Sequence, residues 1–479
     1  MVFETVIGLE VHVQLSTASK IFCRSSTAFG ADPNHHVDPV TMGFPGALPV
    51  LNKKVVESAM RLGLALNCDI RNHNRFARKH YFYPDLPKGY QISQFEEPIC
   101  ERGAIKISVE DTVRTIGITR IHMEEDAGKN IHDARTQASL IDLNRAGVPL
   151  LEVVSEPDLR SAAEAVAFLK TLRQIVRHLD VGDGNMEEGS LRCDANISLR
   201  PEGQLKYGTR AEIKNLNSFK FVEQAIEYEV ARQTKLLREG KTIDQETRLF
   251  DNTSGVTKSM RGKEGAADYR YMPDPDLPPL VIEESWITRV KNSMPMLPEQ
   301  KREQLVKSFG LSDYDASVLT SDRSFIEFFE RTFSICQNAK AACNWITSEL
   351  FGLLNKNGIE LGQSPISSHN LGELIKAVDS EIISGKMAKG IFEEMFTTGK
   401  SAKDIIESKG LKQITDPTEV AKLVNQAFDN NQTQLSEYLA GDERIHPFFV
   451  GQVMKLSGGK ANPRLVNEII KTELTKRSA

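Results

Sequence analysis

The spacing of apolar residues changes once along this chain of 479 residues, near residue 283. Before that point, segments such as ETVIGLEVHVQL (residues 4–15) and RTIGITRIHME (residues 114–124) alternate apolar and polar residues, which is typical of strands with one buried face. Beyond it the strand pattern nearly disappears and helical spacing takes over. The sequence therefore predicts an α+β domain followed by all-α domains.

Two helices are predicted inside the α+β domain. A capping box of Ser161 and Glu164 begins the first, whose apolar residues recur every three or four positions: Ala165, Leu169, Leu172, Val176 and Leu179. Gly240 ends the second, whose apolar face is formed by Val222, Ile226, Val230 and Leu237. A proline-rich segment at residues 271–280 and a Gly-, Asp- and Pro-containing segment near residue 408 interrupt regular structure. We therefore predict domains at residues 1–290, 291–407 and 408–479, the last built from four short helices.

Positive charge is concentrated at the C-terminal end. A total of 60 basic and 65 acidic residues give a net charge of −5, yet residues 444–479 carry seven Lys or Arg against two Glu. This end is predicted to form a helix, a Gly-Gly turn and a second helix entered through Pro463. Nucleic-acid binding would fall on Lys455, Lys460, Arg464 and Lys471. A plain connection between two helices explains the same pattern without a ligand.

Cysteine usage and hydropathy predict a cytoplasmic protein. The six cysteines are scattered without a CxxC pair, as suits reduced thiols. The N-terminal residues lack a basic segment followed by an apolar run, and no stretch of about 18 apolar residues occurs. We therefore expect no secretory leader and no membrane contact.

Acidic and imidazole side chains gather in three segments with strand patterns. In the first, Glu10 and His12 lie on the face opposite the apolar residues. The segment HMEEDAGK adds Glu124 and Glu125, and Glu152 falls on an apolar strand, where a lone charge would be costly. Oxygen-rich ligation with one imidazole favours magnesium or manganese, and magnesium normally accompanies the phosphates of a nucleotide. Surface salt bridges are the alternative explanation for each acid taken singly.

A stiff polar loop is predicted at residues 79–93. Its sequence KHYFYPDLPKGYQIS combines lysines and tyrosines with two prolines and a glycine. Such a loop can hold Lys79, Lys88 and Tyr90 toward an anionic substrate at little entropic cost, as electrostatic catalysis requires. A proline-braced turn without a ligand is the competing interpretation.

A second polar pair of segments lies at residues 184–201 and 211–219. Alternation in SLRCDANISL places Arg192, Asp194 and Asn196 on one strand face, and Glu212 and Lys214 follow in AEIKNLNSF. These side chains can line a polar passage or bind phosphate. Hydrogen-bonded structural pairs fit the pattern equally well.

Eight long motifs follow one another along the chain: GLEVHVQL, FPGALPVLN, RKHYFYPDLPKGYQISQ, HMEEDAGK, DLNRAGVPLLEVVSEPDLR, MEEGSLRCDANISLRP, EIKNLNSF and KEGAADYRYMPDPDLPPL. In this order they resemble the B-subunit family of bacterial and organellar aspartyl/glutamyl-tRNA amidotransferases, over almost the whole chain. The resemblance implies a cradle-shaped catalytic domain similar to glutamine synthetase, with a mainly antiparallel sheet and helices. A helical domain and a small helical tail that contacts tRNA would follow.

The resemblance also implies a reaction and partners. Enzymes of this family use ATP and Mg²⁺ to phosphorylate the side-chain carboxylate of Glu-tRNA(Gln) or Asp-tRNA(Asn), and ammonia then displaces the phosphate. An amidase, the A subunit, and a small C subunit complete a heterotrimer, and the amidase hydrolyses glutamine to supply the ammonia. The sequence of this chain has no Gly/Ser-rich amidase signature and no GxSxG elbow, in agreement with that division of labour. It also lacks a P-loop, because Lys235 stands where the first glycine before Gly240 would be.

Site residues are carried over from the family position by position. Metal ligands would fall on His12, Glu125 and Glu152, with Glu10 and Glu124 close by. The reaction site and the polar channel would include Lys79, Lys88, Glu125 and Asp194. Contacts to ATP are expected from Tyr81, Tyr83, Tyr90, Glu212, Lys214 and Asn217. Phosphorylating a carboxylate brings two anions together, so cations must offset their repulsion.

One departure from the family concerns zinc. Some members hold a structural zinc through a CxC and a later CxxC, but the matching positions here are Cys23, Ser25, Asp38 and Thr41. One thiolate cannot hold a tetrahedral zinc, so no zinc is predicted.

Two other functions stay open from the sequence. A tRNA-binding scaffold explains the basic tail but not Glu152 or the pairing of Glu10 with His12. An ATP-dependent ligase acting on a free amino acid would need neither the tail nor tRNA.

Overall fold

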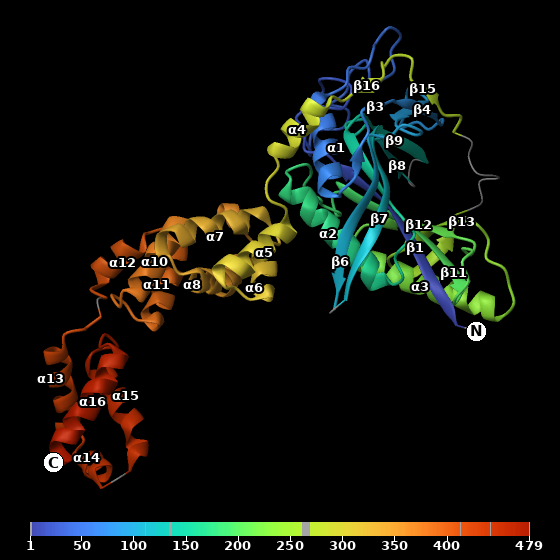
Figure 1. Cartoon of the computed structure of the whole chain (residues 1–479). Helices are drawn as coiled ribbons and strands as arrows, with labels where there is room; N and C mark the ends of the chain where they lie inside the picture. The colour runs from blue at the N-terminus through green and yellow to red at the C-terminus, as the bar shows by residue number, and fades with distance from the viewer. Residues whose placement is uncertain are drawn as a thin grey trace. The chain divides into compact units, whose positions relative to one another are not determined.

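The computed structural model describes residues 2–110, 112–133, 137–260, 269–411, 413–440 and 442–478. The chain forms two compact units, Met1–Pro298 and Glu299–Ala479. Among the described residues every sheet strand lies before residue 282, and helices follow (Figure 1). The predicted change from an α+β region to a helical region is therefore confirmed. The first part of the motif KEGAADYRYMPDPDLPPL, residues 263–268, lies outside the described residues.

A nine-stranded sheet forms the centre of the first unit. In spatial order its strands are β14 (Val256–Ser259), β13 (Glu246–Asp251), β12 (Ala211–Leu216), β11 (Leu191–Pro201), β1 (Phe3–Gln14), β10 (Pro149–Ser155), β7 (Thr112–Glu125), β6 (Cys100–Val109) and β2 (Asp69–Ile70). Neighbouring strands are antiparallel except β12 and β13. These two are parallel because helix α3 (Phe219–Arg238) carries the chain back between them. The mainly antiparallel sheet is as predicted.

The two faces of this sheet differ in chemistry. Along β1, Leu9, Val11 and Val13 are buried, whereas Glu10 and His12 between them are half-buried on the other face. The apolar face packs against α1 (Lys53–Ala65), α2 (Ala162–His178) and α3 around one hydrophobic core. The opposite side is called the polar face below.

Smaller elements complete the first unit. A three-stranded sheet joins β15 (Met272–Pro273), β4 (Ala77–His80) and β5 (Tyr90–Ser93), and β5 contacts β7. Two further pairs are β16 (Leu280–Val281) with β3 (His73–Asn74), and β8 (Lys129–Asp133) with β9 (Ala138–Asp142). Helix α4 (Glu284–Asn292) packs against α1.

Most features of the predicted helix ends agree with the structure. Ser161 caps α2 by accepting from the backbone N–H of Glu164 at 3.2 Å. The second half of the predicted capping box is absent, because the Glu164 carboxylate accepts instead from the backbone N–H of Arg160 at 2.7 Å. Gly240 follows α3 with a φ of 74°, a left-handed conformation that glycine adopts without strain.

The second unit is helical. Its first helices are α5 (Pro298–Phe309), α6 (Asp313–Leu319), α7 (Arg323–Cys336), α8 (Ala339–Asn344), the π-helix η1 (Trp345–Leu350), α9 (Phe351–Asn357), the 3₁₀ segment η2 (Leu361–Gln363), α10 (Ser368–Asp379), α11 (Gly385–Thr398) and α12 (Ala402–Lys409). The last are α13 (Pro417–Asp429), α14 (Gln432–Leu439), the 3₁₀ segment η3 (Glu443–Ile445), α15 (His446–Leu456) and α16 (Pro463–Ser478). These two groups have separate hydrophobic cores. The division of the chain into three domains stays a prediction.

A helix that crosses a lipid bilayer must be both long and apolar. In the part of the chain that the structure describes, no helix meets both conditions.

Candidate active site

Four side chains from three neighbouring strands meet on the polar face of the large sheet. Cross-strand register pairs His12 of β1 with Glu152 of β10, and Glu152 in turn with His122 of β7. Glu124 lies two residues beyond His122 and therefore on the same face of β7. These four residues are called the histidine cluster below.

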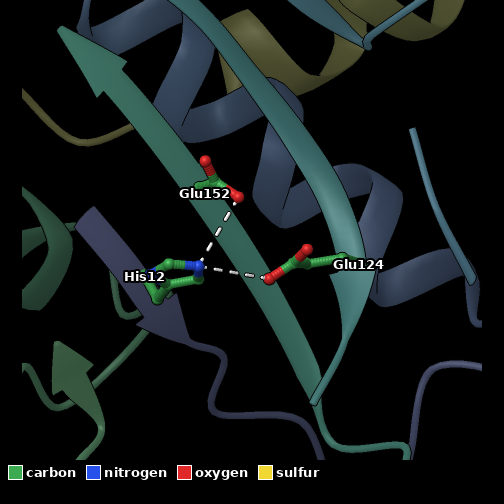
Figure 2. Close-up of side chains that lie close together, drawn as sticks. All are labelled: His12, Glu124 and Glu152. Carbon is green, nitrogen blue, oxygen red and sulfur yellow. Dashed lines mark ion pairs between the residues drawn. The ribbon is translucent and has the colours of Figure 1, made fainter. Parts of the chain in front are cut away.

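The side chains of the histidine cluster point toward one another. Figure 2 shows His12, Glu124 and Glu152 converging from three strands, with His12 Nε2 lying 3.5 Å from Glu124 Oε1 and 3.5 Å from Glu152 Oε2. His122 Nε2 lies 3.2 Å from Glu152 Oε2 and 3.9 Å from Glu124 Oε2. Glu124 and Glu152 are only 3% and 9% exposed, so little water is available to screen their charges.

Carboxylates held this close repel each other unless positive charge lies between them. Burial disfavours the imidazolium of His12, but the hydrogen bond to Glu152 and the charge of Glu124 outweigh it and raise the pKa of His12 to about 9. Burial also raises the pKa of Glu152, yet His122 and His12 together hold this pKa well below its ordinary value. A proton on His12 therefore offsets part of the negative charge of these carboxylates at neutral pH.

The donor atoms of this cluster also fit a divalent metal ion. A nitrogen of His12 and one oxygen each of Glu124 and Glu152 lie within 4.8 Å of one another, a span that one cation can bridge. Carboxylate oxygens suit Mg²⁺ and Mn²⁺, and imidazole nitrogen suits Mn²⁺ better than Mg²⁺. The buried Nδ1 of His122 has no hydrogen-bond partner among the described residues, so this ring interacts through the Nε2 that faces the carboxylates.

Glu125, the last residue of β7, was predicted to bind metal with His12 and Glu152, but the side chain grouped with these two is that of Glu124, and Glu125 lies outside the histidine cluster. Its Oε1 forms an ion pair with Lys88 and accepts from the backbone N–H of Ile92 at 2.9 Å. Gln91 Nε2 donates to the backbone oxygen of Glu125 at 2.7 Å. The side chains of Lys88 and Glu125 are 5% and 4% exposed, so removing either partner would leave a buried charge without compensation. The polar loop therefore holds this carboxylate.

Glu10 lies two residues before His12 along β1. Asn196 Nδ2 donates to Glu10 Oε1 at 3.0 Å. Burial and the negative charges of Glu152, Glu212 and Asp194 raise the pKa of Glu10. Glu10 thus lies between the histidine cluster and a second group of charges.

That second group occupies β11 and β12. Lys214 Nζ lies 2.5 Å from Asp194 Oδ2 and 2.9 Å from Glu212 Oε1, and Thr247 Oγ1 donates to Glu212 Oε2 at 2.7 Å. Burial disfavours the charge on both Lys214 and Glu212, but their pairing prevails: the pKa of Lys214 is raised and that of Glu212 is lowered. Asp194, Glu212 and Lys214 are called the lysine cluster below.

Residues 79–93, predicted as one loop, begin on β4 and end on β5, with Tyr81 and Tyr83 in the loop between these strands. Lys79 Nζ, on β4, lies 4.9 Å from the ring centre of Tyr269, and Tyr81 meets the same ring edge-on at 6.4 Å. Tyr90 begins β5 and is half-buried, whereas Tyr83 is 49% exposed. The sequence predicted that the tyrosines of this segment contact ATP together with Glu212 and Lys214 of the lysine cluster. In the structure, these tyrosines and the lysine cluster lie on different elements.

The remaining predicted contacts are found farther along the chain. Asn217 is exposed beyond the end of β12, and its Nδ2 donates to Asn215 Oδ1 at 3.4 Å. In the second unit α15 ends before the Gly-Gly turn and α16 begins at Pro463, which confirms the predicted helix, turn and helix. The residues predicted to bind tRNA lie here and are exposed except for the half-buried Lys460: Lys455, Lys460, Arg464 and Lys471.

The four positions compared with the family's zinc site lie together. Ser25 Oγ donates to Asp38 Oδ2 at 2.6 Å, and Cys23 Sγ lies 3.9 Å from Thr41 Oγ1. Asp38 Oδ1 also accepts from the backbone N–H of Thr41 at 3.0 Å. Hydrogen bonds thus join the two loops directly. The absence of zinc stays a prediction.

A hollow of about 570 Å³ opens on the polar face beside Glu10. Its walls include Gly8, Asn196, Tyr207 and Arg210. Its volume falls in the range typical of sites for small ligands.

His122 is a member of the histidine cluster that was not predicted from the sequence. In RIHMEED this histidine precedes Glu124 by two residues, a spacing that puts both side chains on one face of a strand. The signal was therefore present in the alternation of β7. The register with Glu152, which completes the cluster, comes only from strand pairing.

Comparison with known proteins identifies the family to which this chain belongs. A model described as the GatB/GatE catalytic domain matches residues 5–288, and one described as the GatB domain matches residues 327–474. The chain is 57% identical over 474 residues to the B subunit of the aspartyl/glutamyl-tRNA(Asn/Gln) amidotransferase of Trichlorobacter lovleyi, covering 99% of this chain and 100% of that protein. Proteins of the same name from Persephonella marina and Pseudomonas syringae are each 53% identical, again over 99% of this chain and 100% of theirs. The resemblance found in the motifs is therefore confirmed, and the chain belongs to the GatB family, the B subunits of glutamine-dependent tRNA amidotransferases.

Proposed function

We propose that this chain uses ATP and a divalent metal ion to activate the side-chain carboxylate of Glu-tRNA(Gln), Asp-tRNA(Asn) or both. Ammonia from a partner glutaminase then converts the activated carboxylate to the amide. The observation that carries the proposal is the histidine cluster, in which two buried carboxylates and two imidazoles converge on the polar face. A surface salt bridge would not need this degree of burial.

The chemistry explains why such a cluster is needed. One carboxylate oxygen of the substrate forms a bond to the γ-phosphorus of ATP while ADP leaves. The nitrogen of ammonia then bonds to the acyl carbon, phosphate leaves and the nitrogen loses a proton. The first step brings two anions together, and a divalent ion held by His12, Glu124 and Glu152 would offset their repulsion. Lys79, on β4, would add fixed positive charge.

The other predicted residues are assigned supporting roles. We propose that Lys88 and Glu125 set the position of the polar loop through their buried ion pair, and that this loop holds Lys79 in place. The hollow beside Glu10 would take part of the nucleotide, with the lysine cluster at its side. Tyr81, Tyr83, Tyr90 and Asn217 do not line this hollow, and we propose that they contact the rest of the nucleotide. A cradle similar to that of glutamine synthetase belongs to the same proposal.

The partners are also part of the proposal. An amidase, the A subunit, and a small C subunit would complete a heterotrimer, as the relatives' name, which designates a B subunit, suggests. Lys455, Lys460, Arg464 and Lys471 would contact phosphates of the tRNA. Replacing the exposed Lys455, Arg464 and Lys471 by alanine should raise the KM for tRNA, and more so at higher salt, while leaving the KM for ATP unchanged.

The decisive experiment uses the complex with its partner subunits. ATP-dependent amide formation is measured on Glu-tRNA(Gln) and Asp-tRNA(Asn) for wild type, Glu152→Gln and Glu125→Ala, with glutaminase activity followed in parallel. The exposed Glu156 lies just beyond β10, so Glu156→Gln is the matched control. Loss of amidation in the first two variants with glutaminase retained supports activation on this chain. Full amidation in Glu152→Gln would refute the proposal and favour a tRNA-binding scaffold.

A further inference from the structure

Aromatic side chains form an open surface beside the histidine cluster. The rings of Phe95 and Tyr271 stack with centroids 4.1 Å apart and planes 6° from parallel. Tyr269 meets Tyr271 edge-on at 6.2 Å, and Tyr81 meets Tyr269 at 6.4 Å. The rings of Phe95, Tyr271 and Tyr269 are called the aromatic shelf, and Tyr81 lies at its edge. Phe95 and Tyr269 are 41% and 38% exposed, so the shelf presents ring surface that the described residues do not cover.

Backbone hydrogen bonds hold the shelf in place. The N–H of His80 on β4 donates to the backbone oxygen of Tyr269 at 2.9 Å, and His80 Nδ1 lies 2.9 Å from the backbone oxygen of Arg270. Strand β15 then pairs with β4 directly after Tyr271. These interactions fix the backbone that carries Tyr269 and Tyr271, which lowers the entropic cost of presenting their rings to a ligand.

Two contacts connect the shelf to the histidine cluster. Ser93 Oγ on β5, two residues before Phe95, donates to Glu124 Oε2 at 3.4 Å. Lys79 Nζ lies 4.9 Å from the ring centre of Tyr269. Burial disfavours the charge of Lys79, but its pKa is raised by the nearby negative charges of Glu124 and Glu152. Lys79 thus contacts the shelf and interacts electrostatically with the carboxylates of the histidine cluster.

We propose that the aromatic shelf stacks the unpaired bases at the 3′ end of the aminoacyl-tRNA and so holds the esterified amino acid at the histidine cluster. The proposal rests on the proposed function, because only a tRNA substrate brings single-stranded bases to this place. Single strands bind through stacking on aromatic rings in series together with basic groups near their phosphates. The shelf supplies both, since Lys79 lies against Tyr269 and the guanidinium of Arg270 lies 5.9 Å from the ring centre of Phe82.

The base of ATP is the competing occupant of such rings. A single nucleotide base is usually held in a concave site with a few fixed polar groups. The hollow beside Glu10 has that form, and its lining includes residues of β1, β10 and β11 but none from the strands that carry the shelf. A row of exposed rings instead matches a succession of bases.

A double comparison tests the proposal in the complex with its partner subunits. Binding of intact tRNA and of tRNA trimmed of its unpaired 3′ nucleotides is measured for wild type, Tyr269→Ala, Phe95→Ala and the conservative Tyr269→Phe. Trimming should weaken binding to wild type and to Tyr269→Phe by on the order of tenfold to a hundredfold. For each alanine variant, trimming should weaken tRNA binding by a several-fold smaller factor. Phe29→Ala, which removes an exposed ring from another loop, is the matched control.

The outcomes separate the proposal from its alternatives. An equal cost of trimming in wild type and both alanine variants would overturn it. A raised KM for ATP with an unchanged cost of trimming would overturn it in favour of the nucleotide base. Absence of amide formation by the wild-type complex would instead count against the proposed function. Unchanged melting temperatures of the variants exclude a loss of folding as the cause.

Discussion

The histidine cluster and the lysine cluster lie on the same face of the same sheet but balance their charges differently. In the lysine cluster Lys214 lies 2.5 Å and 2.9 Å from the oxygens of Asp194 and Glu212. In the histidine cluster Glu124 and Glu152 face imidazoles, at distances from 3.2 Å to 3.9 Å. One cluster carries a permanent cation, and the other carries a proton that can leave.

This difference separates a structural arrangement from an exchangeable one. Pairing raises the pKa of Lys214, so its charge persists throughout the physiological pH range. His12 has a pKa of about 9 and becomes a neutral ligand when a metal ion replaces its proton. The histidine cluster is therefore suited to cation exchange, whereas the lysine cluster is suited to fixing β11 and β12 together.

The largest expected effect is on catalysis. Glu152→Gln should lower the rate of amide formation by roughly a hundredfold or more, because it removes a charge that the reaction needs to hold a cation. Glu212→Gln should lower it by roughly tenfold or less, since Lys214 still meets Asp194. Single-turnover amidation with saturating tRNA measures both. Equal losses would mean that the two clusters do the same work.

Metal addition should separate the clusters by stability. Mn²⁺ at a hundredfold excess over its Kd stabilises a folded protein by about 2.7 kcal/mol, which raises the melting temperature by several degrees. Glu124→Gln should abolish this rise, and Asp194→Asn should keep it. Differential scanning calorimetry with and without Mn²⁺ measures the effect. A rise that survives in Glu124→Gln would locate the ion elsewhere.

The pH dependence of stability should reveal the proton on His12. Its pKa is raised from 6.5 to about 9, so the stabilisation is complete below pH 6.5 and is lost as the pH rises through 9. In EDTA, wild type should therefore lose its advantage over His12→Gln between pH 7 and pH 10, by at most about 3 kcal/mol. With Mn²⁺ the advantage should instead grow from pH 6 to pH 8, because fewer protons compete. Urea unfolding at each pH provides the comparison, and parallel trends in EDTA and Mn²⁺ would contradict proton-metal competition.

The smallest effect should come from removing the permanent cation. Lys214→Met leaves Asp194 and Glu212 without their shared partner, and because Lys214 is partly exposed the melting temperature should fall by only about 1 °C. The same variant should gain stabilisation by Mn²⁺ beyond that of wild type. Thermal unfolding in matched buffers tests this, with Lys220→Met, an exposed lysine on α3, as control. If Mn²⁺ does not stabilise Lys214→Met more than wild type, a pair of carboxylates alone is not sufficient to bind the ion.

The alternation of residues predicted much of this fold and part of the site. It correctly placed Glu10 and His12 opposite the apolar residues of β1, and Arg192, Asp194 and Asn196 on one face of β11. These features depend only on the two-residue period of a strand. The order of the strands in the sheet depends on pairing between distant segments, which local spacing does not contain.

The same limit explains why the sequence could not distinguish the roles of Glu124 and Glu125. Glu124 and Glu125 are adjacent residues of the same type, but neighbouring residues on a strand point to opposite sides. The structure places Glu124 with His12 and Glu125 with Lys88. The buried Glu229 of α3 was not anticipated either, because its partners Arg232 and Thr257 include a residue from a distant strand.

The register of β1, β10 and β7 also limits how this gene can change in length. One codon inserted in the middle of β10 would rotate every following side chain to the other face, sending Glu152 into the apolar core. Two inserted codons would restore the alternation but shift Glu152 away from His12 and His122. Insertions and deletions tolerated by descendants of this gene should therefore accumulate in the turns, while these three strands keep a constant length.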